Sequence, residues 1–235
     1  MFDYYCQKFG FDSVEINSSF YNLPSAKSME SLARRSPPNF SFMAKLYNTF
    51  THNFAEATTD KLRQFREGIA PLEESGKLKG VLAQFPAAYR PGKKEMEWLL
   101  QLRDRLGPLP VFMEFRHYLW TNPAVFTFLR KEKIGYCITD LPKVEPLPRF
   151  IATVTNGTAY VRLHGRNREW YKPTTSRYDY QYSDRELQSI YTAIQNISPE
   201  PVNIFFFFNN CHAGNAVVSA SRLAGLTQKK LAGMG

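Results

Sequence analysis

The sequence has no long hydrophobic run and few cysteines, and both scarcities limit the class of protein. No apolar stretch reaches the roughly 18 residues that a membrane-spanning helix needs, and the N-terminus lacks the basic and apolar segments of a secretory leader. Only three cysteines occur, Cys6, Cys137 and Cys211, and they are scattered without the spacing of a metal site. We therefore expect a cytoplasmic protein that does not partner a membrane.

Other absences limit the architecture. No internal repeat, low-complexity tract or Gly/Ser linker divides the chain, so we expect one domain over residues 1–235. No glycine-rich phosphate loop follows an early strand, which disfavours a dinucleotide-binding sheet. Hydrophobic residues make up 43% of the chain and charged residues 22%, which is typical of a globular protein with a sizeable core.

The charge balance is basic. Lys and Arg number 30 against 21 Asp and Glu, giving a formal net charge of +9. Such a charge favours anionic partners, either an anionic small molecule or nucleic acid. A lysine-rich surface without such a partner is an equally simple reading of the net charge alone.

Short apolar runs alternate with helical patterns along the chain. The expected strands are residues 14–20, 40–46, 80–86, 111–116, 135–140, 159–165 and 203–210. The expected helices are residues 61–74, capped by Asp60, 95–106, 123–133, 186–194, opened by a capping box at Ser183–Glu186, and 212–226. Strand and helix in alternation predict a parallel α/β sheet, either doubly wound or a TIM-barrel-like (β/α) barrel.

Almost every expected strand turns polar at its C-terminal end. The polar residues are Glu15, Asn17, Lys45, Gln84, Glu114, Arg116, His117, Asp140, Arg162, His164, Asn209 and Asn210. Alternation assigns pairs such as Glu15 with Asn17 to one face of their strand. In a parallel barrel these faces point inward, and the carboxyl ends of the strands form the rim that holds the site.

The same polar residues also allow a purely structural interpretation. Buried ion pairs, Glu114 with Arg162 for instance, could tie neighbouring strands together, and a single histidine such as His52 is more often structural than catalytic. Burying many charges is costly unless each is well paired. Charges of both signs at one end of a barrel therefore favour a polar ligand.

An aromatic and basic segment follows the sixth expected strand, from Arg162 to Ser183. It interleaves cations with aromatic rings: Arg166, Arg168, Trp170, Tyr171, Lys172, Arg177, Tyr178, Tyr180 and Tyr182. Arginine binds phosphate in a bidentate manner and aromatic rings stack on bases, a combination used on nucleotides and single strands. A loop that packs its own tyrosines over the barrel is an equally good interpretation.

The motifs in order resemble one known family. "VEINSSFYNLPS", "FSFMAKLYNTFTH", "VLAQFP", "VFMEFRHYLW", "YVRLHGRN", "YDYQYSDREL" and "FFFFNNCHAGNAVVSA" are similar to the successive motifs of the YecE-like family, domain of unknown function 72. The resemblance runs from Val14 to about Ala224 and implies a TIM-barrel-like fold. It supplies no established reaction, and a nuclease-like role rests only on analogy with metal-dependent barrel endonucleases.

The resemblance also marks a difference at the N-terminus. Family members usually begin with a strand carrying a Gly-Thr-Ser-Gly-Trp-like motif, whereas here Met1 already belongs to the helix that follows it. Seven of eight barrel strands are therefore expected. The expected gap lies between residues 203–210 and the strand of Glu15, unless another segment or chain covers that edge.

The first functional hypothesis is an enzyme for a phosphate-containing or other anionic substrate, with nucleic acid as one candidate, in the manner of a phosphodiesterase or nuclease. Arg116, Arg162 and Lys45 would hold the anion. Glu15 or Glu114 would be the general base and His164 the acid. The expected substrate-binding set is Asn17, Tyr21, His52, Gln84, Arg116, His117, Arg162, Arg166, Trp170, Tyr178, Asn209 and Asn210.

A divalent metal on Glu15, Glu114, Asp140 and a histidine is an open alternative for a hydrolase, although the cations of the ring would repel it. Two further hypotheses remain. An isomerase or lyase for a small sugar-like or carboxylate substrate would use Lys45 as base or Schiff-base amine. A non-catalytic module would bind nucleic acid or a nucleotide through the aromatic and basic segment.

Overall fold

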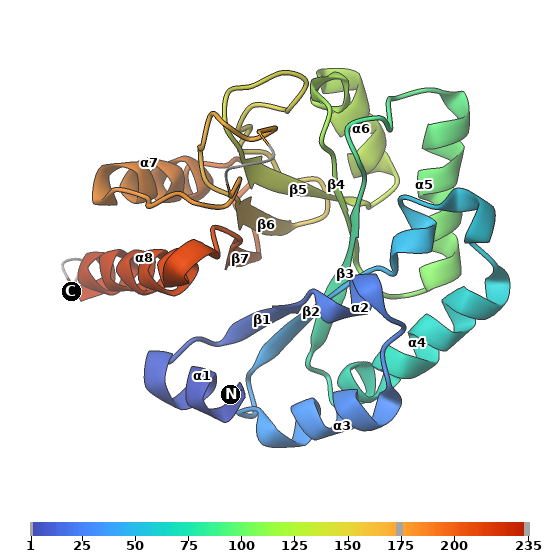
Figure 1. Ribbon diagram of the computed structural model, residues 1–235, viewed down its shortest axis with the longest axis horizontal. Coiled ribbons are helices and arrows are strands. Elements are labelled where there is room, and N and C mark those ends of the chain that lie inside the picture. The colour runs from blue at the N-terminus through green and yellow to red at the C-terminus, as the bar shows by residue number, and fades with distance from the viewer. Residues whose placement is uncertain (1, 173–175, 233–235) are drawn as a thin grey trace. The chain divides into compact units, whose positions relative to one another are not determined.

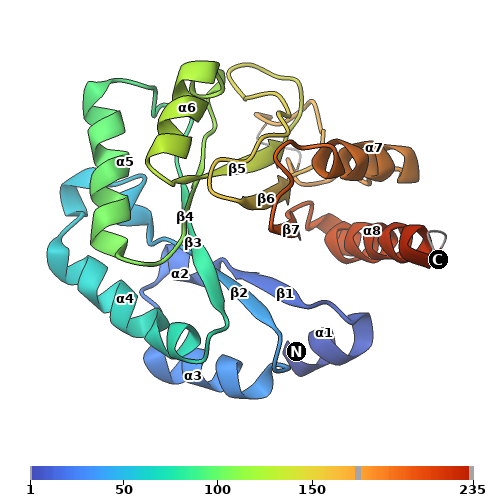
Figure 2. The ribbon, with the colours of Figure 1, turned by 180° about the vertical axis from the view of Figure 1, so that it is seen from behind.

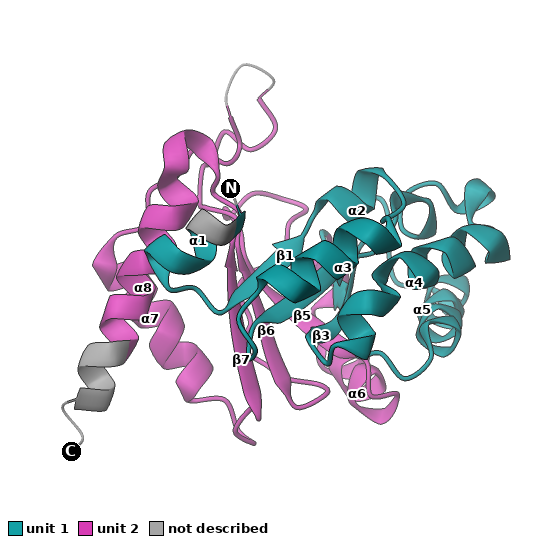
Figure 3. Cartoon of the chain, turned by 90° about the horizontal axis from the view of Figure 1, so that it is seen from below, with its two compact units in different colours: residues 1–116 teal, residues 117–235 magenta. Residues whose placement is uncertain are grey.

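The computed structural model describes residues 2–172 and 176–232 and divides the chain into two compact units. Unit 1 comprises residues 1–116 and unit 2 residues 117–235 (Figure 3). Each unit is built from parallel strands that alternate with helices. A single domain over residues 1–235 stays a prediction.

Unit 1 is a four-stranded parallel sheet in which consecutive strands pair (Figure 1). The strands are β1 (Ser13–Ile16), β2 (Ser41–Lys45), β3 (Leu78–Gln84) and β4 (Val111–Glu114). The helical elements are α1 (Phe2–Phe9), α2 (Ser18–Tyr21), α3 (Ala26–Arg35), η1 (Asn48–Phe50), η2 (Phe54–Glu56), α4 (Thr59–Glu74) and α5 (Lys93–Leu106). Helices α3, α4 and α5 flank the strands on one side in both views (Figures 1 and 2).

Unit 2 pairs three parallel strands, also in chain order. They are β5 (Gly135–Asp140), β6 (Thr158–Leu163) and β7 (Asn203–Phe208). The helical elements are η3 (Tyr118–Trp120), α6 (Pro123–Lys131), α7 (Asp184–Gln195), η4 (His212–Gly214) and α8 (Asn215–Ala232). Helices α7 and α8 lie side by side, and α8 packs on β7 (Figure 2).

The strands of unit 1 carry apolar side chains on both faces, and both faces are buried. Phe42, Val81, Leu82 and Phe112 are fully or almost fully buried although they alternate in direction along their strands. Continuous burial of this kind is typical of parallel sheets packed under helices. The seven parallel strands of the described residues, alternating with helices, confirm the predicted α/β class.

One expected strand ends early. Residues 14–20 were expected to be extended, but β1 ends at Ile16, and Asn17 takes a right-handed helical conformation with φ −82° and ψ −21°. The buried hydroxyl of Ser19 lies 2.6 Å from the carbonyl oxygen of Lys45, which explains the turn into α2. Alternation along β1 therefore applies to Glu15 but not to Asn17.

One helix prediction needs correction, one is confirmed, and one helix was missed. The cap of α4 is Thr58, whose hydroxyl accepts from the backbone N–H of Lys61 at 3.2 Å, so the expectation of Asp60 was wrong. Asp60 lies in the first turn instead, where its charge suits the helix dipole. The capping box of Ser183 and Glu186 is present at the start of α7. Helix α3 was not predicted.

Within residues 2–172 and 176–232, no helix combines the length and the apolar composition needed to cross a bilayer.

Candidate functional site

The polar strand ends of unit 1 share one face of its sheet. Paired residues of parallel strands point the same way, and the register pairs Glu15 with Met43, and Lys45 with Leu82. Gln84 lies two residues beyond Leu82 and pairs with Glu114. Glu15, Lys45, Gln84 and Glu114 therefore lie on the same face, toward the carboxyl ends of four adjacent strands.

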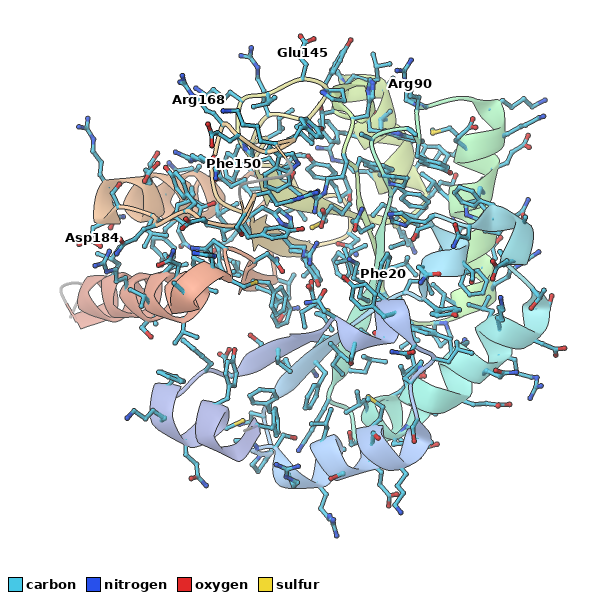
Figure 4. All side chains as sticks on the ribbon, viewed as in Figure 1. Phe20, Arg90, Glu145, Phe150, Arg168 and Asp184 are labelled. Atoms are coloured by element: carbon cyan, nitrogen blue, oxygen red, sulfur yellow. The ribbon has the colours of Figure 1, made fainter. Side chains whose placement is uncertain are left out.

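Lys45 is a buried cation at the end of β2, and only 8% of the residue is exposed. Its Nζ lies 3.1 Å from Oε1 of Gln84 and 4.0 Å from the centre of the Phe20 ring. Phe20 lies on α2 (Figure 4). An amide oxygen and an aromatic face stabilise an ammonium group without cancelling its charge. These contacts hold the Lys45 ammonium in place at the end of β2.

Glu114 and Arg116 form an ion pair at the end of β4. Nε of Arg116 donates to Oε1 of Glu114, which is fully buried, while the Arg116 side chain is 13% exposed. The carboxylate thereby orients the guanidinium, a planar group with five N–H donors in a fixed fork. Such a fork matches the geometry of phosphate and carboxylate ligands.

His52 lies near both cations, in the turn between η1 and η2. Its ring meets Phe20 edge-to-face at 5.1 Å, and its Nδ1 lies 2.9 Å from the hydroxyl of Thr51. Partial burial lowers the pKa of His52, and the positive charges of Lys45 and Arg116 lower it further. Both effects favour the neutral form of the ring, and the two cations give its surroundings a positive potential.

The other predicted residues of unit 1 lie beside this cluster. Glu15 is half-buried on β1, Asn17 precedes α2, and Tyr21 at the end of α2 is 68% exposed. The Tyr21 ring packs edge-to-face on Phe20 at 5.1 Å. We call Lys45, His52, Gln84, Glu114 and Arg116 the cationic cluster of unit 1.

In unit 2 the predicted residues divide between the two faces of the sheet. The register pairs Arg162 with Thr139, whereas Asp140 pairs with Leu163. Asp140 therefore lies on the face opposite to Arg162. The expected ring of polar strand ends does not include both of these residues on one face.

Asp140 is the centre of a dense hydrogen-bond network. Arg166 donates to both carboxylate oxygens, from Nη2 to Oδ1 at 2.9 Å and from Nε to Oδ2 at 2.9 Å. The Tyr182 hydroxyl donates to Oδ2 at 2.6 Å, and burial followed by the Asp140 charge raises the pKa of Tyr182 well above its ordinary value. Arg166 also donates to Glu186 on α7 at 3.0 Å. This arrangement favours an anchoring role for Asp140 over a catalytic one.

The remaining predicted residues of unit 2 make contacts within that unit. Nη2 of Arg162 donates to Oδ1 of Asn209 at 3.2 Å, and Nδ2 of Asn210 donates to the carbonyl of Tyr180 at 2.9 Å. The buried His164 lies edge-to-face with Trp170 at 6.3 Å. Nδ1 of His117 accepts from the backbone N–H of Leu119 at 3.2 Å, which caps η3.

The aromatic and basic segment offers fewer stacking faces than its composition suggests. Trp170 and Tyr182 are buried, and Trp170 packs against Tyr178, which is 36% exposed. Lys172 pairs with Glu169, and the guanidinium of Arg177 lies 5.8 Å from the centre of the Trp170 ring. Residues 173–175 of the segment lie outside the described residues. The part that is described fits a loop that packs its own rings.

Sequence reasoning missed three residues on which these arrangements depend. Phe20 holds both Lys45 and His52, but in the sequence it is one apolar residue of an expected strand. Tyr182 and Glu186 complete the Asp140 network, but the sequence marked Tyr182 only as a ring of the aromatic and basic segment and Glu186 only as part of the capping box. Long-range contacts of this kind have no local pattern.

The carboxylate and histidine metal set, an open alternative from the sequence, has no counterpart in the part of the chain that is described. There, no three His, Cys, Asp or Glu side chains are grouped so that they could hold a metal ion. Carboxylates at the strand ends instead contact arginines, as in the Glu114–Arg116 and Asp140–Arg166 pairs.

Solved structures and a curated protein resemble this chain over nearly its whole length. A DUF72 family protein from Thermotoga maritima MSB8 is 34% identical with a TM-score of 0.87, covering 96% of this chain and 88% of that one. A DUF72 family protein from Enterococcus faecalis V583 is 26% identical with a TM-score of 0.87, covering 97% and 93%. The UPF0759 protein YunF of Bacillus subtilis (strain 168) is 26% identical over 95% of this chain and 86% of its own length.

These matches confirm the TIM-barrel-like α/β fold and the family expected from the sequence motifs. The matching family is described as "Protein of unknown function DUF72", and the match extends over residues 1–234. The chain therefore belongs to the DUF72 family.

Proposed function

We propose that the protein is an enzyme that acts on a phosphate-containing or other anionic substrate, bound by the cationic cluster of unit 1. The observation that carries the proposal is the position of the buried Lys45. Gln84 and Phe20 hold it at the carboxyl end of β2, and Arg116 follows the carboxyl end of β4 in the same sheet. Two cations fixed at the carboxyl ends of parallel strands are suited to hold an oxyanion and to stabilise negative charge that develops on it.

Each residue of the cluster has a proposed role. Lys45 and Arg116 bind the anion, and Glu114 fixes the Arg116 guanidinium. His52, whose surroundings favour the neutral ring, is the candidate to accept a proton from a nucleophile or water, and Glu15 on β1 is the other candidate base. In unit 2, Arg162 as an anion-binding residue and His164 as a general acid are separate proposals. More specifically, we propose a phosphodiesterase or nuclease that acts in the cytoplasm.

One alternative retains a supporting observation. A buried lysine amine beside a neutral amide, as Lys45 lies beside Gln84, also suits an isomerase or lyase for a small carboxylate. The non-catalytic binding module is less well supported, because Trp170 and Tyr182 are buried and cannot stack on a base.

Replacing Lys45 with methionine is expected to weaken sulfate or phosphate binding by about 10-fold, since one charge-assisted contact is lost. Calorimetric titration with sodium sulfate measures the change. The matched control is Lys79→Met, which removes the same charge from an exposed lysine of β3 whose Nζ contacts the Gly76 carbonyl at 2.8 Å. Equal losses in the two variants would show that only net charge attracts the anion and would overturn the proposed site.

A further inference from the structure

A pocket of about 540 Å³ lies in unit 1 beside the cationic cluster. Its lining consists mainly of aromatic and apolar groups with cations among them, and includes His52, Phe54, Tyr89, Arg90, Lys94 and Trp98. The volume is within the usual range of small-molecule sites, about 300–1,000 Å³. The pocket is therefore large enough for a small organic ligand.

The aromatic walls form one connected set. The Phe54 ring stacks on Tyr89 with centroids 5.6 Å apart and meets Trp98 edge-to-face at 5.8 Å. Tyr89 in turn stacks on Phe85 at 4.2 Å, which backs the wall with a fully buried ring. A fixed array of this kind is suited to a flat aromatic ligand, because aromatic pairs prefer stacked or edge-to-face contact.

The polar atoms of these walls already have partners within the protein. Nε1 of Trp98 donates to the carbonyl of Phe50 at 3.0 Å, and the Tyr89 hydroxyl donates to the carbonyl of Glu95 at 2.8 Å. The half-buried Trp98 therefore presents its ring surface, not a hydrogen-bonding group, to an occupant, whereas the buried Tyr89, stacked on Phe54 and Phe85, supports the wall. Stacking on such surfaces tolerates different bases.

Charge at the pocket favours an anionic ligand. The exposed Arg90 (Figure 4) and Lys94 lie in its lining with one acidic side chain, Glu95. His52 also lines the pocket, and its ring touches Phe20, above which the Lys45 ammonium lies. A ligand whose ring fills the pocket can therefore extend an anionic group past His52 toward Lys45 and Arg116.

We propose that the substrate or ligand is a nucleotide, whose base stacks in the aromatic pocket and whose phosphate binds Lys45 and Arg116. The binding of the phosphate in this assignment rests on the proposed function, whereas the binding of the base rests on the pocket alone. The ligand class is a nucleoside monophosphate or the end of a nucleic acid strand, since both contain the same ring and phosphate.

Calorimetric titration of the intact protein with three ligands tests the binding of the base and the binding of the phosphate separately. Adenosine monophosphate contains the ring and the phosphate, adenosine only the ring, and ribose 5-phosphate only the phosphate. The monophosphate is expected to bind at least about 10-fold more tightly than either fragment. The monophosphates of the other three ribonucleosides are expected to bind within about 10-fold of it, because stacking is tolerant of base identity.

Two variants assign the halves to residues. Phe54→Ala removes a wall that is 41% exposed and is expected to weaken monophosphate and adenosine binding by about 10-fold, with ribose 5-phosphate unchanged. Lys45→Met is expected to weaken the monophosphate and ribose 5-phosphate, with adenosine unchanged. Leu119→Ala in unit 2, also 41% exposed, is the control and is expected to change none of the three.

The outcomes distinguish the two proposals. Equal binding of monophosphate and ribose 5-phosphate, insensitive to Phe54→Ala, would overturn the base pocket and leave the anion site intact. Equal binding of monophosphate and adenosine, insensitive to Lys45→Met, would overturn the anion site and with it the nucleotide assignment. Failure of all four monophosphates to bind at millimolar concentration would overturn both the base pocket and the anion site.

Discussion

Replacing Asp140 with alanine is expected to lower the free energy of unfolding by about 3 kcal/mol, because a buried carboxylate is removed from donors that were arranged around it. Arg166 and Tyr182 would both lose their hydrogen bonds to it. The loss is placed near the lower end of the range for buried pairs, since the Arg166 side chain is 36% exposed and can turn to water. Urea denaturation followed by circular dichroism measures the change.

Asp179→Ala is the matched control for this prediction. Asp179 lies in the segment between Arg166 and Tyr182, its side chain is 54% exposed, and its contact with His212 spans 3.7 Å. Its removal is expected to cost no more than about 0.5 kcal/mol, as for other exposed pairs. If Asp140→Ala were as mild as Asp179→Ala, the anchoring role of Asp140 would be wrong and the catalytic reading would regain support.

Replacing Gly68 with alanine is expected to destabilise the protein by about 3 kcal/mol through a steric clash. Gly68 lies within α4, and a Cβ atom there would fall 2.2 Å from the carbonyl oxygen of Pro24 and 2.8 Å from its Cγ. The oxygen belongs to the backbone just before α3, so relief requires the two helices to separate. Alanine is the better helix former by about 1 kcal/mol, but the clash outweighs that gain.

The same substitution at Gly225 provides the control. Gly225 lies within α8, and a Cβ atom there would meet nothing within 4 Å. Gly225→Ala is therefore expected to stabilise the protein by up to about 1 kcal/mol. Thermal unfolding of the two variants should shift in opposite directions. A Gly68→Ala variant as stable as Gly225→Ala would contradict the close approach of α4 to Pro24.

The sequence predicted the fold well because its signals are local. Apolar runs such as residues 135–140 and capping patterns such as Ser183–Glu186 depend on neighbours in the chain, and the structure contains both elements. The early end of β1 was missed because it depends on the contact of Ser19 with Lys45, 26 residues away. The close approach at Gly68 was equally invisible, since Pro24 is distant in sequence.

The candidate site was only partly predictable from the sequence. Alternation placed Glu15 and Glu114 on one face correctly, because strand periodicity decides it. It did not reveal that Asp140 lies on the face opposite to Arg162, which depends on the register of β5 with β6. The aromatic pocket was also missed, because Phe54, Tyr89 and Trp98 come from separate segments.

The pKa of His52 tests most directly the claim that Lys45 and Arg116 form an anion site. Nuclear magnetic resonance titration of the imidazole, assigned among the four histidines with His52→Asn, measures it with and without sulfate. Burial and the two cations disfavour the protonated ring, so the pKa should lie below the ordinary 6.5. Sulfate bound between the cations should raise the pKa, and Lys45→Met should raise it without sulfate. A pKa at or above 6.5 that responds to neither change would contradict the account.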